Sequence, residues 1–305
     1  MQQNGQVESF AGSATSMLTS GVIDAHQHFW QIGRHGHVWP GSDLHAIYRD
    51  FTPSEIQACC ESNGVRGTVL IQSQPNHRDT DWLLALAATT PLVQGVVGWV
   101  DFRSRDAPGR IAKLASRPKM SGLRPMLQDL PRDDWILDPA LDPAIDAMCS
   151  AQLSFDALIR PRHLRFLREF AARWPRLRIV IDHGAKPPIA GGALEPWQSD
   201  LAGVAEFPNV YCKLSGLVTE MAPGQGSAVL ERFARPIVEL FGHERLIWGS
   251  DWPVLNLASD FTAWLALSIA LIAPAGHDAL DAVFRGNATR FYRLGSDSPP
   301  DRPGN

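Results

Sequence analysis

The sequence predicts an α/β fold in which eight parallel strands close into a (β/α)8 barrel. Short apolar runs rich in β-branched residues alternate with longer amphipathic segments along most of the chain. From the second run onward the runs begin 26 to 36 residues apart, which is the length of one strand, one helix and two loops. No glycine-rich phosphate loop follows any run, which disfavours the main alternative, an open doubly wound sheet.

The predicted strands are residues 21–29, 67–74, 93–102, 120–127, 152–159, 178–185, 209–216 and 245–253. Two predicted helices between them carry clear boundary signals. In residues 52–64, Thr52 is the expected N-cap, Glu55 completes a capping box and Gly64 ends the helix. Residues 160–175 form the second helix, which Pro175 ends.

We expect a single barrel domain over residues 21–294, with a flexible leader over residues 1–20 and a flexible tail over residues 295–305. The leader lacks the basic and apolar regions of a signal peptide, and the tail is rich in Pro, Gly and Asp. The longest irregular stretch, residues 30–51, follows the first strand. Long loops at this position commonly build one wall of a pocket.

The composition favours a protein that acts on small molecules. The formal net charge is -4 and no basic tract is present, so we expect neither nucleic acid nor a membrane as a partner. No run is long and apolar enough to span a bilayer. The four cysteines include an adjacent pair, Cys59 and Cys60, which suits neither a disulfide framework nor zinc ligation. We therefore expect a reduced, cytoplasmic setting, whereas the oligomeric state stays unknown.

Two histidines stand one residue apart at the end of the first predicted strand. Side chains alternate along a strand, so His26 and His28 are expected to point the same way, with Asp24 behind them on the same face. Two imidazoles aimed at one point indicate a site.

Polar residues also lie at or near the ends of most of the other predicted strands, where the active sites of such barrels are built. They are Gln72, Gln74, Asp101, Arg124, Gln128, Asp182, His183, Lys213, Ser215 and Asp251. Each has an ordinary structural explanation when taken alone, but their convergence at one end of the barrel favours a site. His163 instead fits a solvated position in the first turn of a helix. We expect surface positions for the remaining histidines, which are His35, His37, His45, His77, His243 and His277.

Five segments resemble, in order, motifs of the amidohydrolase superfamily, in its branch of sugar lactonases typified by enzymes for L-fucono- and L-rhamnonolactone. The segments are DAHQHFW, GLRPMLQD, IDHGAKP, YCKLSGL and GSDWPV. The resemblance spans roughly residues 22–292. It implies a distorted (β/α)8 barrel of the amidohydrolase type, in which a water or hydroxide lies beside Asp251.

The resemblance also raises the question of a metal. Many members of the superfamily bind a divalent ion, and this sequence offers His26, His28 and Asp251 as ligands for one ion such as Zn²⁺. The fifth predicted strand supplies neither His nor Lys, and Arg124 stands where binuclear enzymes have a ligand. A guanidinium near a dication raises the electrostatic energy. We therefore expect chemistry that requires no cofactor, with one divalent ion as the alternative.

A lactone is a cyclic ester, so its hydrolysis needs an activated water, a polarised carbonyl and a proton for the departing oxygen. We assign the general base to Asp251, which would then return its proton to the ring oxygen. His26, His28, His183 and Arg124 are expected to surround the carbonyl oxygen and stabilise its developing charge.

The expected substrate is a neutral, polyhydroxylated sugar acid lactone. Its candidate binding residues are Trp30, Tyr48, Gln72, Gln128, Lys213 and Trp252, with Trp39 as a further ring near the site. A dicarboxylate lactone would need several convergent cations, and only Arg124 is evident, with Lys213, Lys186 or Arg49 as helpers. The alternatives are a metal-dependent decarboxylase, a hydrolase of dicarboxylate or muconolactone-type lactones, and a barrel that binds without catalysis.

Overall fold

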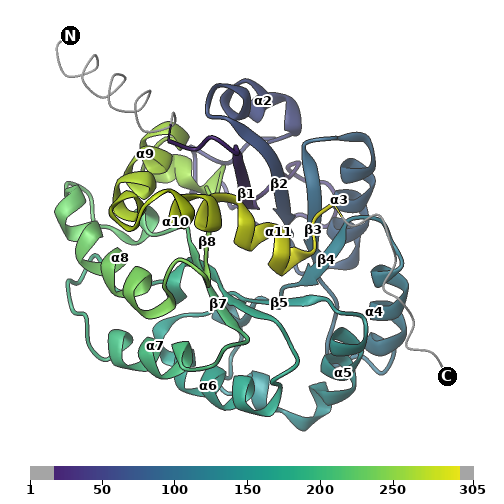
Figure 1. The fold of residues 1–305 in the computed structure, drawn as a ribbon. Helices are drawn as coiled ribbons and strands as arrows, with labels where there is room; N and C mark the ends of the chain where they lie inside the picture. Colours follow the sequence, from purple (N-terminus) through teal and green to yellow (C-terminus); the bar gives the residue numbers. More distant parts are fainter. Residues whose placement is uncertain (1–16, 296–305) are drawn as a thin grey trace.

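The computed structural model of the protein describes residues 17–295 (Figure 1). Its eight strands form one sheet in which each strand runs parallel to the next in sequence order. They are β1 (Val22–Gln27), β2 (Val65–Ile71), β3 (Val93–Gly98), β4 (Met120–Leu123), β5 (Ser154–Ala157), β6 (Ile179–Ile181), β7 (Val210–Leu214) and β8 (Leu246–Trp248). A parallel bridge between Gln27 and Trp252 joins β1 to the segment after β8. The sheet closes, and the predicted (β/α)8 barrel is confirmed.

Helices lie between successive strands and after β8 (Figure 1). They are α2 (Pro53–Ser62), α3 (His77–Thr89), α4 (Ala107–Ala115), α5 (Asp142–Ser150), α6 (Leu164–Arg173), α7 (Trp197–Ala205), α8 (Ser227–Phe241), α9 (Phe261–Ile272), α10 (His277–Asp281) and α11 (Asn287–Tyr292). The backbone N–H of Thr52 donates to the Glu55 carboxylate at 3.1 Å, as the predicted capping box requires. The helix expected over residues 160–175 is α6, which a 3₁₀ turn over Pro161–His163 precedes.

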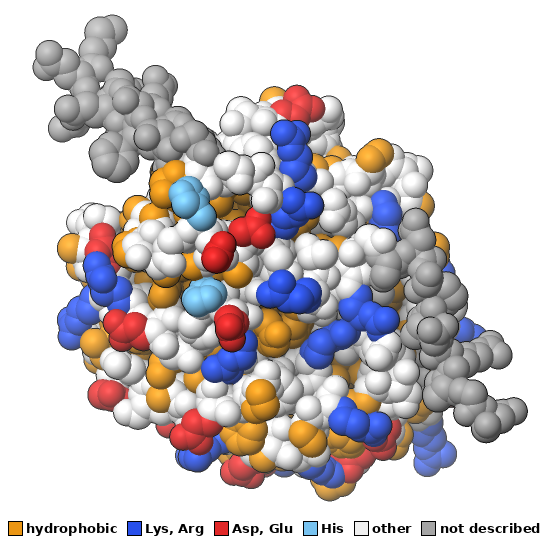
Figure 2. Space-filling view, in the orientation of Figure 1, with side chains coloured by type: hydrophobic (Ala, Val, Ile, Leu, Met, Phe, Trp, Pro, Cys, Tyr) orange, Lys and Arg blue, Asp and Glu red, His pale blue; other side chains and the backbone are white. Residues whose placement is uncertain are grey.

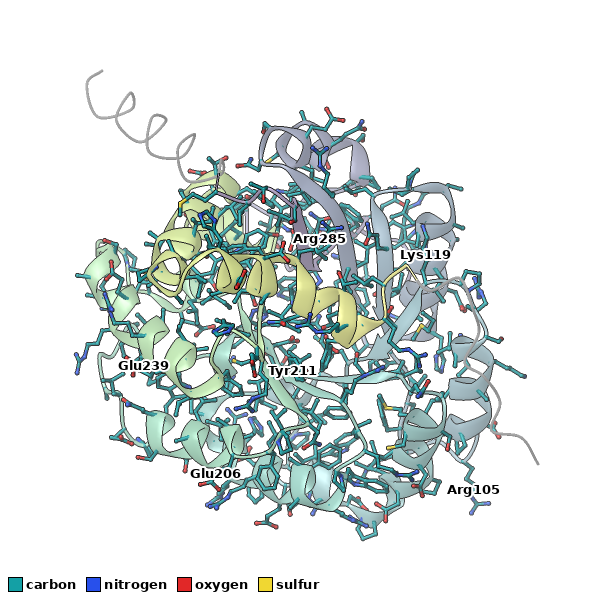
Figure 3. The ribbon with its side chains drawn as sticks, viewed as in Figure 1. Arg105, Lys119, Glu206, Tyr211, Glu239 and Arg285 are labelled. Carbon is teal, nitrogen blue, oxygen red and sulfur yellow. The ribbon has the colours of Figure 1, made fainter. Side chains whose placement is uncertain are left out.

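The inside of the barrel has an apolar core of its own. Strand residues Ile23, Val69, Val97, Val180 and Ile247 pack there with Phe291 and Tyr292 of α11. The ring of Tyr211 on β7, labelled in Figure 3, lies 4.9 Å from that of Phe291. Because α11 closes the end where the strands begin, the opposite end is free to hold polar groups.

Each predicted strand overlaps an observed one, but most observed strands end earlier than predicted. The sixth was predicted to reach residue 185 and ends at Ile181, and the eighth was predicted to reach residue 253 and ends at Trp248. Beyond these ends the backbone turns into the left-handed region, with φ of +55° at His183 and +62° at Asp251. Residues other than glycine rarely adopt this conformation. The candidate site residues His183 and Asp251 therefore lie just after the ends of β6 and β8 and not within these strands.

The irregular stretch over residues 30–51 begins and ends at one antiparallel bridge. Trp30 and Phe51 exchange backbone hydrogen bonds of 3.1 and 2.9 Å. Gln74, after β2, holds the middle of the stretch, because its side-chain oxygen accepts from the backbone of Val38 at 2.7 Å and of Trp39 at 3.2 Å. The stretch is therefore anchored beside the end of β1, where it was expected to form a wall.

The predicted leader and tail lie almost entirely outside the described residues. Within residues 17–295, no helix combines the length and apolar character needed to cross a lipid bilayer. On the face shown in Figure 2, acidic, basic and apolar side chains are interspersed, in keeping with the small net charge.

Candidate active site

Three imidazole nitrogens surround one carboxylate oxygen at the carboxyl end of the barrel. The Nε2 atoms of His26, His28 and His183 lie 3.6, 3.4 and 3.9 Å from Oδ1 of Asp251. All four residues are nearly inaccessible to solvent. The structure thus brings together His26 of β1, His28 directly after it, and residues from the segments that follow β6 and β8.

Backbone contacts between β1 and the end of β8 hold Asp251 in place. Its N–H donates to the carbonyl of His26 at 2.8 Å. The preceding residue, Ser250, donates to the Asp24 carboxylate through its N–H at 2.8 Å and its hydroxyl at 2.6 Å. The expectation that Asp24 stands behind the histidines on one face is wrong. Its neighbours Ile23 and Ala25 pack inside the barrel, and a register shift between Asp24 and Gln27 interrupts the alternation before the histidines.

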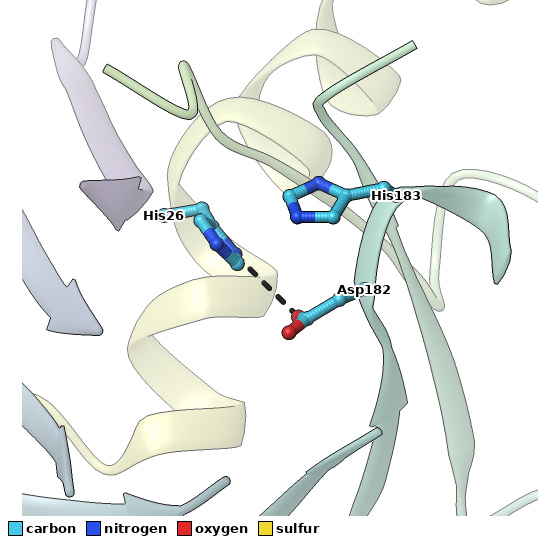
Figure 4. A group of neighbouring side chains, drawn as sticks. All are labelled: His26, Asp182 and His183. Carbon is cyan, nitrogen blue, oxygen red and sulfur yellow. Dashed lines mark ion pairs between the residues drawn. The ribbon is translucent and has the colours of Figure 1, made fainter. Parts of the chain in front are cut away.

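The backbone of His183 and the residues after β7 fix the orientation of the His183 side chain. It follows Asp182 directly, and the two side chains reach the same region as His26 (Figure 4). The Nδ1 atom of His183 lies 2.9 Å from the hydroxyl of Ser215. A Cβ at Gly216, which has φ of +61°, would fall 2.4 Å from this nitrogen. The close approach of this loop to the imidazole therefore requires glycine.

Arg124 joins the cluster from the end of β4. Its Nη1 lies 3.4 Å from Nε2 of His26 and 3.4 Å from Oδ2 of Asp182. Its Nη2 donates to the backbone carbonyl of Gln72. A single planar guanidinium thus bridges three groups, and Arg124 is only 3% exposed.

Lys213 lies on the other side of His26 from Asp251. Its side chain is fully buried, and Nζ lies 2.8 Å from Asp156, 3.0 Å from Asp182 and 3.1 Å from Nδ1 of His26. Two buried carboxylates and one imidazole thus surround the ammonium. The structure therefore places Lys213 as a support of His26 and does not bring it to the pocket where substrate binding was expected.

Sequence reasoning missed two residues of this buried network. Asp156 on β5 accepts hydrogen bonds from Ser154 at 2.9 Å and from the hydroxyl of Tyr292 at 2.6 Å. A signal for Asp156 was present, since an acidic residue in the middle of a short apolar strand needs a buried partner. Tyr292 gave no such signal, because it lies on α11, far from the strand ends in sequence.

Burial and charge set the protonation of the central groups. Burial alone would raise the pKa of Asp251, but His183 and His28 outweigh it and hold that pKa below its usual range. Burial lowers the pKa of His183 to about 4 against the opposing effect of Asp251. Burial likewise lowers the pKa of His26 and His28. The site at neutral pH is an ionised carboxylate surrounded by neutral imidazoles.

The remaining candidates for substrate contact divide into two groups. Gln72 is buried and Gln128 half-buried, and the side-chain oxygen of each lacks a hydrogen-bond partner among the described residues. Tyr48 is 40% exposed on the 30–51 stretch. Trp30 and Trp252 are instead buried, and their rings lie 5.3 and 5.1 Å from that of Phe51. Both tryptophans thus pack against Phe51.

Two other strand-end residues and one histidine lie elsewhere. Asp101 is exposed and accepts a hydrogen bond from the backbone of Arg103 at 3.0 Å, so it caps a turn outside the cluster. Gln74 orders the 30–51 stretch, as described above. The expected solvated position of His163 is wrong, because that side chain is 2% exposed and accepts from the backbone N–H of Arg160 at 3.0 Å.

The spacing around Asp251 would suit a metal, but the neighbouring charges do not. The ligand atoms of His26, His28 and Asp251 lie within 4.8 Å of one another, a cluster that could hold a divalent ion. However, Arg124 lies 3.4 Å from Nε2 of His26 and Lys213 lies 3.1 Å from Nδ1. Two permanent cations touching one ligand repel a dication. The spacing of these ligand atoms thus allows a divalent ion, and the two adjacent cations oppose it.

Comparisons with known proteins agree with this architecture. A family described as Amidohydrolase matches residues 23–294. L-fucono-1,5-lactonase of Burkholderia ambifaria is 52% identical over 92% of this chain and 96% of its own. L-fucono-1,5-lactonase of Burkholderia multivorans is 31% identical over 89% of this chain and 96% of its own. A solved amidohydrolase from Burkholderia multivorans with bound zinc has a TM-score of 0.85 and 29% identity, over 90% of this chain and 99% of its own.

Proposed function

Because the chain belongs to the amidohydrolase family, we propose that it is a lactonase that hydrolyses a sugar acid lactone to the open-chain acid. The observation that carries the proposal is the approach of three imidazole nitrogens, from His26, His28 and His183, to one oxygen of Asp251 at 3.4 to 3.9 Å. This arrangement can hold one water against a base while polar groups face the ester carbonyl.

The reaction assigns the base to Asp251. It takes a proton from the water as the water oxygen attacks the carbonyl carbon of the lactone. The low pKa of Asp251 keeps this carboxylate ionised at any ordinary working pH. Charge then develops on the carbonyl oxygen, and Arg124 with an imidazole N–H stabilises it, each donor contributing up to about 3 kcal/mol in comparable sites. Collapse breaks the bond to the ring oxygen, which receives the proton from Asp251.

The pairing of the available cations supports a neutral substrate. Arg124 and Lys213 both engage buried carboxylates. Arg49 pairs with Glu55, and Lys186 lies 3.8 Å from Glu220. None of these four therefore adds a free cation that would clamp a second carboxylate. A dicarboxylate lactone and the substrate of a decarboxylase both need such a clamp.

Neutral polar groups suit the hydroxyls of a sugar ring. The unpartnered side-chain oxygens of Gln72 and Gln128 are acceptors for substrate hydroxyl groups, and Tyr48 offers a further hydroxyl. The curated relatives named as L-fucono-1,5-lactonases point to a six-membered aldonolactone of the L-fucono type. We propose this lactone as the first substrate to assay.

We further propose that the reaction requires no metal. Two observations support this. Arg124 and Lys213 both contact His26, and Lys213 also binds Asp156, which is the carboxylate on β5. A relative solved with zinc makes the metal requirement a direct target for experiment.

A panel of 1,4- and 1,5-aldonolactones, followed with a pH indicator before and after exhaustive chelation, tests the function. We expect hydrolysis of L-fucono-1,5-lactone well above its spontaneous rate, with the activity kept after chelation. Absence of hydrolysis for every lactone would overturn the proposed function. Loss of activity on chelation that zinc restores would overturn only the metal-free mechanism.

A further inference from the structure

The two histidines of the H-x-H pair have different hydrogen-bond partners. The Nδ1 atom of His28 lies 2.8 Å from the backbone carbonyl of Ile71. A carbonyl only accepts, so this nitrogen carries the proton of the neutral ring. The Nε2 atom of His28 then presents a lone pair to Oδ1 of Asp251, 3.4 Å away. Nε2 of His28 and Oδ1 of Asp251 are then both hydrogen-bond acceptors, so a group that donates to both, such as water, suits the space beside them.

His26 meets the opposite situation. Its Nδ1 atom lies 3.1 Å from the ammonium of Lys213, which only donates, and 3.5 Å from Oδ1 of Asp182. The first distance is within the range of a hydrogen bond and the second is beyond it. Nδ1 therefore accepts, and the proton of the neutral ring is on Nε2. Arg124 also approaches Nε2, at 3.4 Å, but this is the longer of the two contacts, so we take Lys213 to set the tautomer.

Lys213 is itself rigidly held. Asp156 and Asp182 engage its ammonium at 2.8 and 3.0 Å, and Asp156 is fixed in turn by Ser154 and Tyr292. The whole network is buried. The direction of the N–H bond of Lys213 toward His26 is therefore set by the fold before any substrate binds.

We infer that the fold holds His26 and His28 in opposite tautomers, and that Lys213 is the positioning residue that imposes the tautomer of His26. The inference rests on the proposed lactonase function and deepens it. The attacking water donates one hydrogen to Nε2 of His28 and the other to Asp251, whereas the Nε2–H of His26 donates to the carbonyl oxygen. As the C–O bond forms, the O–H bond to Asp251 breaks and the carbonyl π electrons move to the oxygen that His26 faces.

Nuclear magnetic resonance of ¹⁵N-histidine-labelled protein tests the inference without a substrate. Protonated and unprotonated ring nitrogens resonate at well separated frequencies, and long-range correlations tell Nδ1 from Nε2. At a pH about one unit above the usual pKa of histidine, where both rings are neutral, we expect the proton of His26 on Nε2 and that of His28 on Nδ1. A spectrum with both protons on the same atom type would overturn the inference, even if the protein hydrolyses lactones.

A pair of variants tests the role of Lys213. Asp156→Asn keeps Lys213, whereas Lys213→Met with Asp156→Asn removes the donor while leaving no unpaired Asp156 charge. We expect the single variant to keep the tautomer of His26. The double variant should lose that tautomer, and its kcat should fall about 10- to 100-fold at nearly constant KM. A double variant that folds and matches the single variant in both spectrum and kcat would show that Lys213 is only structural.

Discussion

At the scale of single residues, the site depends on groups in conformations and charge states that they would not adopt alone. His183 and Asp251 both have positive φ, a strain of order 1 to 3 kcal/mol at each residue. The surrounding barrel compensates for this strain, and the result is that both side chains point at one spot. Strain of this kind clusters at functional sites, which supports the catalytic roles that we propose for His183 and Asp251.

The guanidinium of Arg124 offers a residue-scale prediction. Arg124→Lys keeps the positive charge near Asp182 but cannot bridge His26, Asp182 and the carbonyl of Gln72 with one planar group. We expect kcat to fall about 10- to 100-fold with a smaller change in KM, because the lost contact serves the developing oxyanion. Steady-state kinetics measures this, with thermal unfolding as the control for the fold. Unchanged kcat would remove Arg124 from the mechanism.

At the scale of elements, the sequence predicted where the strands lie but not where β6 and β8 end, next to His183 and Asp251. Apolar runs identify buried parallel strands because both faces of such strands are covered. The same runs continue through His183 and Asp251, so periodicity could not reveal that the backbone turns there. Lys213 shows the other limit, because its residue type gives no hint that Asp156 and Asp182 would enclose it.

Gly216 gives a prediction at this scale, since it concerns how the loop after β7 meets β6. Gly216→Ala would place a Cβ 2.4 Å from Nδ1 of His183, in addition to the strain of a positive φ. We expect a loss of unfolding free energy of about 1 to 3 kcal/mol and a 10-fold or larger fall in kcat.

Gly224→Ala is the matched control. Gly224 has φ of +85° and no atom within 4 Å of an added Cβ, so it carries the backbone strain without touching His183. Urea unfolding and kinetics on both variants separate the two effects. Equal kcat in the two variants would mean that displacement of His183 does not matter.

At the scale of the whole molecule, one end of the barrel is apolar and the other is a buried polar cluster. The α11 residues Phe291 and Tyr292 fill the first end, and Tyr292 also reaches Asp156 in the network behind His26. Because the same buried contacts join the core to the titratable groups of the site, we expect the free energy of unfolding to depend on the protonation of those groups.

His183 makes this linkage measurable. Its pKa of about 4 in the fold lies below the usual 6.5, so the unfolded chain binds the proton first as the pH falls. The stability from this group is complete above pH 6.5 and is lost as the pH falls through 4, by about 3 kcal/mol. We expect urea unfolding at several pH values to show a steeper acid loss in the wild type than in His183→Gln. Parallel curves would contradict the assignment.

The central claim is that Asp251 activates a water held by the neighbouring imidazoles, and Asp251→Asn tests it most directly. The substitution preserves the size of the side chain and removes the base. With L-fucono-1,5-lactone and protein treated with a chelator, we expect the wild type to hydrolyse the lactone well above the spontaneous rate and the variant to lose about 100-fold or more of that activity. A folded Asp251→Asn protein that hydrolyses the lactone at the wild-type rate would contradict it.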